Sequence, residues 1–186
     1  MNAPAPTLRL RREDGFTLVE LLIAMIVLSI AILALVAAYT SGFTALKRAT
    51  RVSSARLVAD AQMERLRAIP YSAIQLNTTC GAICTEDATY TGDTAYSSTA
   101  QVTGCTTTDS TCMPTQTKTG PDGASYRLDT YITYNCWSGT LSTSPSVTCG
   151  GGTIPPPVKR VTVVVRSSTL TTPVREQSTF TTLPGS

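Results

Sequence analysis

The sequence of 186 residues contains no histidine, which removes the commonest general base and the commonest metal ligand of proteins. It also lacks a G-x-S-x-G motif and a glycine-rich phosphate-binding loop. There is no long run of Lys and Arg, and the formal net charge is only +3, which gives little support for a nucleic-acid partner. The composition therefore argues against an enzyme and against a bound cofactor.

Carboxylates are the remaining candidates for acid–base chemistry. The aspartates after Tyr71 could form pairs, and they are Asp87, Asp93, Asp109, Asp122 and Asp129. Four of them lie among turn-forming residues, where aspartate is ordinary. We therefore predict no catalytic site from this set.

What the chain does have is one long apolar run near the N-terminus, residues 16–39, FTLVELLIAMIVLSIAILALVAAY. As a helix these residues would extend about 36 Å, enough to cross a hydrocarbon core of roughly 30 Å. Arg9, Arg11 and Arg12 precede the run, and such basic residues favour a cytoplasmic location for this end. The remainder of the chain is then expected outside the cytoplasm.

A single acid, Glu20, interrupts this run. A carboxylate at mid-bilayer costs roughly 2.5 to 3.5 kcal/mol, and less near the interface, so an acid inside a membrane span is by default a functional residue. We expect Glu20 to need a cationic partner.

Three interpretations of the N-terminus compete. A secretory signal peptide could be cleaved after Ala38, but its apolar region is usually shorter and would not contain Glu20. A plain signal anchor accommodates the length but gives Glu20 no purpose. In the third interpretation the chain is cut directly after Gly15, and the apolar helix stays on the mature protein.

The string GFTLVELL, preceded by arginines and followed by an apolar helix, resembles the N-terminal processing motif of type IV pilins and of type II secretion pseudopilins. The resemblance is strong over residues 11–39 and weaker beyond. It implies that a prepilin peptidase cuts between Gly15 and Phe16 and methylates the new amino terminus of Phe16. It also implies that Glu20 aids assembly by pairing with such an amine, in a neighbouring subunit or in its own helix.

The helix is expected to continue past the membrane. Residues 44–69 contain no proline and are rich in good helix formers, and Pro70 then disfavours helix at Ile69. One apolar stripe runs along this stretch through Val52, Ala55, Ala59, Met63 and Leu66. We predict one helix over residues 16–69, with a soft point at Ser41 and Gly42. The resemblance implies that its amphipathic second half packs on a β-sheet.

Strand-like alternation appears in the second half, where residues 71–186 contain 28 threonines. Residues 125–135, 158–167 and 173–182 are predicted to form consecutive antiparallel strands that cover the helix stripe. Residues 77–123 are expected to form a loop-rich insertion. The prediction is an α+β, pilin-like fold, divided into a leader (1–15), a membrane helix (16–39), an amphipathic helix (40–70) and an exported β domain (71–186).

Six cysteines suggest disulfides and an oxidising compartment: Cys80, Cys84, Cys105, Cys112, Cys136 and Cys149. Fifteen pairings are open, and we favour nearest neighbours, namely Cys80 with Cys84, Cys105 with Cys112 and Cys136 with Cys149. Only the first two cysteines have the spacing of a zinc ligand pair, and no histidine could complete the site. We therefore predict no metal.

For function, the resemblance implies a minor pilin incorporated into or priming a type IV pilus. Residues 31–39 lack the proline found in many major pilins, and ADAQMERLRAIPY, residues 59–71, resembles the distal helix of PilV-type minor pilins and related pseudopilins. The implied partners are other pilin subunits, prepilin peptidase and an inner-membrane assembly platform. The alternatives are a type II secretion pseudopilin and an adhesive or DNA-binding minor pilin. DNA binding is disfavoured because the distal basic residues are dispersed: Lys118, Arg127, Lys159, Arg160, Arg166 and Arg175.

Overall fold

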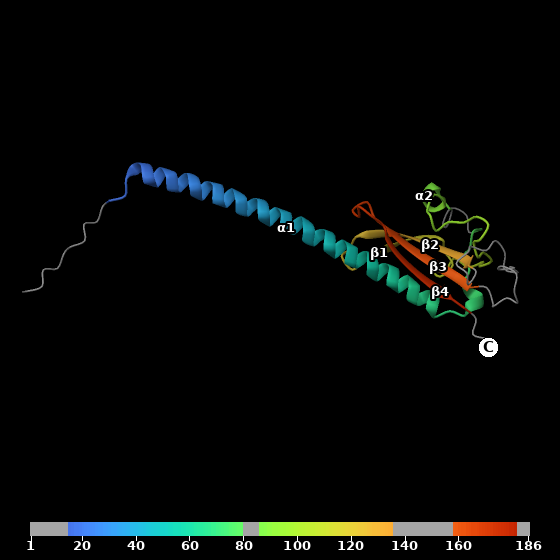
Figure 1. Ribbon diagram of the computed structural model, residues 1–186. Helices are drawn as coiled ribbons and strands as arrows, with labels where there is room; N and C mark the ends of the chain where they lie inside the picture. Colours follow the sequence, from blue (N-terminus) through green and yellow to red (C-terminus); the bar gives the residue numbers. More distant parts are fainter. Residues whose placement is uncertain (1–14, 80–85, 136–157, 182–186) are drawn as a thin grey trace, which may run out of the picture. The chain divides into compact units, whose positions relative to one another are not determined.

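The computed structural model of the chain describes residues 15–79, 86–135 and 158–181. Its elements, labelled in Figure 1, are α1 (Leu18–Arg67), the short 3-10 helix η1 (Tyr71–Ala73), α2 (Ala88–Thr91), β1 (Thr115–Thr119), β2 (Ser125–Asn135), β3 (Val158–Arg166) and β4 (Val174–Phe180). The chain divides into two compact units, Met1–Leu46 and Lys47–Ser186, which are described separately. The predicted α+β class is confirmed.

Helix α1 forms because no proline interrupts residues 18–67 and strong helix formers dominate them. The helix passes through Ser41 and Gly42 without a break in its secondary structure. It ends at Arg67, shortly before Pro70, as expected from the restriction that proline places on the preceding residue. Arg65 and Arg67 lie in the last turn, where cations interact favourably with the helix dipole.

In the first unit, every described side chain of α1 is exposed. This part of the helix has the length and the apolar composition needed to cross a membrane. Its surface is apolar on all sides, so no face of it is suited to water. Lipid or other protein must therefore cover it.

In the second unit, four strands form one antiparallel sheet in the order β1-β2-β3-β4. The three predicted strands are confirmed as β2, β3 and β4. Strand β1 was not predicted: it lies in the segment that we expected to be loop-rich, and its sequence TQTKT is polar. The β1–β2 turn needs Gly120, since a Cβ there would lie 2.5 Å from the ring of Tyr126.

The main core lies between the second part of α1 and one face of the sheet. The predicted stripe is confirmed for Ala55, Ala59, Met63 and Leu66, and Val58 joins it. Val52 was wrongly included, since it is only partly buried and lies outside this cluster. Facing them are the alternate residues of β2 and β3 (Tyr126, Leu128, Ile132, Val161, Val163 and Val165) together with Ile74, Leu76 and Val102. The alternation along β2 and β3 therefore selects the face that the helix covers.

The opposite face of the sheet carries a second, smaller cluster. Tyr90 of α2 stacks on Tyr131 of β2 with ring centroids 4.4 Å apart, and both pack with Val164. The hydroxyl of Tyr90 donates to the carbonyl of Thr130 (2.7 Å), and the hydroxyl of Tyr131 donates to the carbonyl of Tyr90 (3.1 Å). Figure 1 shows α2 on the side of the sheet away from α1. Residues 86–96 thus form an outer layer.

A disulfide joins Cys105 to Cys112, as nearest-neighbour pairing predicted. Closing this short loop contributes about 2.5 kcal/mol in the chain-entropy model. The other four cysteines, Cys80, Cys84, Cys136 and Cys149, lie outside the described residues, and their pairing stays a prediction.

Candidate functional site

The first turn of α1 is capped by Thr17. The backbone N–H of Glu20 donates to the Thr17 hydroxyl (3.3 Å) and to the Thr17 carbonyl (3.1 Å). Thr17 and Glu20 have the spacing of a capping box, in which a Ser or Thr side chain accepts from the third helical N–H. This role of Thr17 was not predicted, although the Thr-x-x-Glu pattern signals it.

Glu20 therefore lies in the first turn of α1, where a carboxylate interacts favourably with the helix dipole. Between Phe16 and Leu46 it is the single charged residue. The helix terminus offers part of the compensation that a carboxylate in an apolar setting needs.

The bond between Gly15 and Phe16 precedes the helix in an exposed, non-helical stretch. A Cβ added at Gly15 would meet no atom within 4 Å, and Phe16 is 77% exposed. A protease approaching this bond would meet no tertiary obstacle from the described part of the chain. The geometry is compatible with processing here.

At the other end of the apolar run, Tyr39 and Phe43 form an edge-to-face pair with ring centroids 4.6 Å apart. Aromatic side chains are enriched where membrane spans meet the interface. The pair therefore lies where such a helix would leave the hydrocarbon.

In the second unit, three of the five candidate aspartates bind arginines on the outer face of the sheet. Arg127 makes a bidentate contact with Asp87 (2.5 and 2.7 Å) and a bond to Asp129 (2.8 Å). Arg166 contacts Asp129 (3.2 Å) and also Asp93. Carboxylates held this way are bound as structural ions, which leaves them poorly suited to acid–base work.

Asp87 and Asp93 connect the outer layer to the arginines of the sheet, and the Asp93 side chain is the more deeply buried of the two. Arg175 donates to both of its oxygens (2.8 and 2.7 Å), and the N–H of Ala95 donates as well (2.9 Å). Burial acts to raise the pKa of Asp93, but the hydrogen bonds from Arg175, Ala95 and Arg166 outweigh it and lower this pKa to about 2. For Asp87, hydrogen bonding to Arg127 holds the pKa well below its usual range.

Folding gathers three of the dispersed basic residues, Arg127, Arg166 and Arg175, but each of them binds an aspartate. Lys159 is buried and donates to two backbone carbonyls. Aspartates thus neutralise the three arginines and Lys159 is buried, so this gathering creates no open cationic surface in the described part of the chain.

Metal ligands do not converge in the part of the chain that the structure describes: no group of three or more Cys, Asp or Glu side chains there is arranged to hold an ion. The distinctive chemistry of the described residues is thus the N-terminal arrangement of Gly15, Phe16, Thr17 and Glu20 on an apolar helix.

Comparison with known protein families agrees with this emphasis. Residues 10–36 match the model of the prokaryotic N-terminal methylation motif, the signature of type IV pilins and pseudopilins. The motif recognised from GFTLVELL is thereby confirmed, while the match does not extend to the second unit. No curated protein and no solved structure matches the chain.

Proposed function

We propose that this protein is a minor pilin, a structural subunit of a type IV pilus. Prepilin peptidase removes residues 1–15 and methylates Phe16, and the subunit waits in the cytoplasmic membrane with its second unit exported. It then joins other pilin subunits through an inner-membrane assembly platform. The observation that carries the proposal is an accessible Gly15–Phe16 bond inside a methylation motif, followed by an apolar stretch of α1 with one acid, whose side chains are all exposed as far as Leu46.

The N-terminal helix has an uncovered apolar surface and an acid without a cation, and both favour assembly with other subunits. Its apolar surface has no cover in its own unit, so lipid must cover it before assembly and other helices afterwards. Glu20 lacks a cation between Phe16 and Leu46, and cleavage creates one, the amine of Phe16. A carboxylate paired with an amine in a low-dielectric setting interacts far more strongly than in water.

A type II secretion pseudopilin is the second candidate. The methylation motif serves both classes, and the match to it does not distinguish them. Adhesion or DNA binding by a minor pilin remains a further alternative for the second unit. The pairing of its outer-face arginines with aspartates weakens the DNA alternative.

Processing tests the proposal directly. The full chain is co-expressed with a prepilin peptidase, and precursor and product are separated by gel mobility. Wild type should lose residues 1–15, whereas Gly15→Leu should stay as precursor because a bulky side chain obstructs the cleavage site. Gly42→Ala is the matched control, since a Cβ there also meets nothing within 4 Å, and it should be processed like wild type. Equal processing of the Gly15→Leu chain would contradict the proposed cut.

A further inference from the structure

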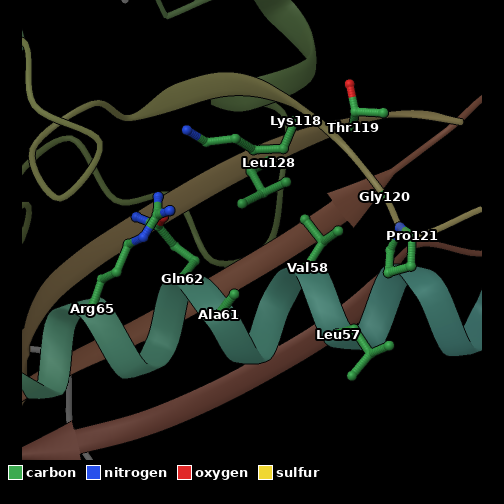
Figure 2. A pocket seen from close by; sticks show the side chains of 10 residues that line it. All are labelled: Leu57, Val58, Ala61, Gln62, Arg65, Lys118, Thr119, Gly120, Pro121 and Leu128. Atoms are coloured by element: carbon green, nitrogen blue, oxygen red, sulfur yellow. The ribbon is translucent and has the colours of Figure 1, made fainter. Parts of the chain in front are cut away.

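A groove of about 400 Å³ runs between the second part of α1 and strand β1 in the second unit. We call it the α1–β1 groove. Leu57, Val58 and Ala61 of α1 and Leu128 of β2 supply apolar surface, while Arg65 of α1 and Lys118 of β1 supply charge. Figure 2 shows the two cations reaching from α1 and β1 toward the same end of the groove.

Neither cation has an acidic partner among the described residues, whose ion pairs include neither Arg65 nor Lys118. Arg65 donates only to a neutral group, the hydroxyl of Ser110 (3.1 Å). On the outer face of the same sheet, by contrast, every arginine of the network binds an aspartate. Two cations at one end of an apolar groove are suited to a carboxylate.

Gln62 indicates a second property of the ligand, a hydrogen-bond donor. Its side chain lines the groove and is only 1% exposed. The Nε2 of Gln62 donates to the carbonyl of Ser110 (2.6 Å), but its Oε1 has no hydrogen-bond partner. Gln116 of β1 repeats the arrangement, with Nε2 on the same carbonyl (3.0 Å) and an unpartnered Oε1. A buried amide oxygen without a donor is rare in folded proteins, so the site is suited to a ligand that offers an N–H.

The open edge of the sheet indicates a third property of the ligand, an extended backbone. Strand β1 is the end strand of the sheet in the described part of the chain, so one of its two edges carries no neighbouring strand there. An extended peptide that pairs with such an edge points alternate side chains to each face of the sheet. On the helix side those side chains would enter the α1–β1 groove beside Gln116 and Lys118.

Lys118 also has a simpler explanation, because charged residues that point inward on edge strands protect proteins from unwanted strand pairing. That explanation accounts for the exclusion of a purely apolar strand. It does not account for the amide oxygen of Gln62, nor for the presence of a second cation, Arg65, at the same end of the groove. A strand that carries a carboxylate can pair with Lys118, whereas an apolar strand would bury this cation without a partner. The charge of Lys118 therefore makes the edge selective.

We propose that the α1–β1 groove binds an extended peptide segment of a partner protein, one that carries a carboxylate between apolar side chains. The carboxylate pairs with Arg65 and Lys118, the apolar side chains cover Leu57 and Ala61, and a peptide N–H serves Gln62. This interaction goes beyond the pilin proposal and does not depend on N-terminal processing.

Fluorescence anisotropy with the full chain in detergent micelles tests it, using two labelled probes. One is acetyl-VTETVT-amide, which places Val, Glu and Val on one face of a strand, and the other is acetyl-VTKTVT-amide. The glutamate probe should bind with a Kd about tenfold lower than that of the lysine probe. The double variant Arg65→Gln, Lys118→Gln should abolish this preference. Arg56→Gln, on α1 but outside the groove, should retain it.

Three anisotropy results would overturn the proposal. The first is no measurable binding of the glutamate probe, and the second is equal binding of both probes. The third is a preference that survives in the double variant. Sedimentation of the same samples tests whether a second copy of the chain occupies the groove instead. Concentration-dependent dimerisation that the double variant abolishes would assign the groove to that second copy and overturn the proposal. Because all readouts use unprocessed and processed chain alike, they are independent of whether the Gly15–Phe16 bond is cut.

Discussion

Glu20 is subject to two requirements at the first turn of α1. Its backbone N–H is held by the Thr17 cap, and its side chain lies in the positive field of a helix N-terminus. Neither contact requires a neighbouring subunit. The assembly role proposed for Glu20 therefore has to be separated from its local role in the helix.

Substitution at Glu20 and Thr17 separates these roles. Glu20→Gln keeps the shape of the side chain and removes its charge, so it should be processed normally yet enter sheared filaments at a much reduced level. Thr17→Ala removes the cap at a cost of about 1 kcal/mol but keeps the charge, so its incorporation should stay closer to wild type. Immunoblots of the filament and membrane fractions measure both. Normal incorporation of the Glu20→Gln chain would remove the assembly role.

Lys159 shows what a buried charge does at the far end of α1. Its Nζ donates to the carbonyls of Tyr71 (2.7 Å) and Ile74 (2.9 Å) and lies 4.3 Å from the centre of the Tyr71 ring. Lys159 is 3% exposed, and burial lowers its pKa to about 8. Lys159 therefore binds the segment after α1 to β3, and it loses its proton at a lower pH than an exposed lysine.

This geometry sets a pH dependence. The unfolded chain keeps the Lys159 proton to about pH 10.5, whereas the folded chain releases it near pH 8, so the free energy of unfolding should rise between pH 8 and 10. Above pH 10 the trend should reverse, since burial raises the pKa of Tyr71 to about 12 and the unfolded chain then loses that proton first. Urea titrations followed by circular dichroism measure the curve.

Lys159→Met is the matched test of this assignment. The variant should lose about 1 to 3 kcal/mol, because the buried carbonyl of Ile74 is left without a donor among the described residues and the carbonyl of Tyr71 loses one of its donors, keeping the N–H of Ile74 (3.3 Å). It should also lose the rise between pH 8 and 10. A rise that persists in the variant would assign the effect to another group.

At the scale of elements, the sequence predicted what depends on local pattern. The alternation of apolar residues along 125–135 and 158–167 was sufficient to place β2 and β3. Strand β1 escaped because TQTKT has no apolar alternation, and only its pairing with β2 reveals it. The α1–β1 groove was not predicted either, since Arg65 and Lys118 lie far apart in sequence.

The outer layer could not have been predicted for a related reason. Asp93 meets Arg166 and Arg175 only because β3 and β4 pair in a register that sets Val164 opposite Arg175. Nothing near Asp93 in sequence indicates these partners. Aspartates in turn-like surroundings were expected to be ordinary, and their pairing is a product of tertiary structure.

Asp93→Asn tests the attachment of the outer layer to the sheet. The variant loses two ion pairs to a largely buried carboxylate, so the free energy of unfolding should fall by about 2 to 3 kcal/mol at pH 7. Glu64→Gln is the control, since its pair with Arg67 is exposed and should contribute less than about 0.5 kcal/mol. Denaturant titration of both variants measures the difference, and equal losses would contradict the assignment.

The same network gives an acid limit. The pKa values of Asp93 and Asp87 are lowered in the folded chain, so their contribution is complete above about pH 4 and is lost as the pH falls toward 2. The Asp93→Asn chain should show a shallower loss over this range.

At the scale of the whole molecule, the two units divide the work. The unit ending at Leu46 offers an apolar helix with one acid, which suits a membrane and, on the proposed function, a packed assembly. The unit beginning at Lys47 has its own core, an ion-paired outer layer and a disulfide, which suits an oxidising exterior.

Mass spectrometry of the amino terminus of the mature protein shows where the chain is cut and whether the new terminus is methylated. The protein is purified from membranes of cells that contain prepilin peptidase, and its N-terminal peptide is sequenced. The account predicts a chain that begins at Phe16 and carries a methyl group on its amine, with Glu20 as its fifth residue. A mature chain that begins at Tyr39, or one that retains residues 1–15 in the presence of the peptidase, would contradict it.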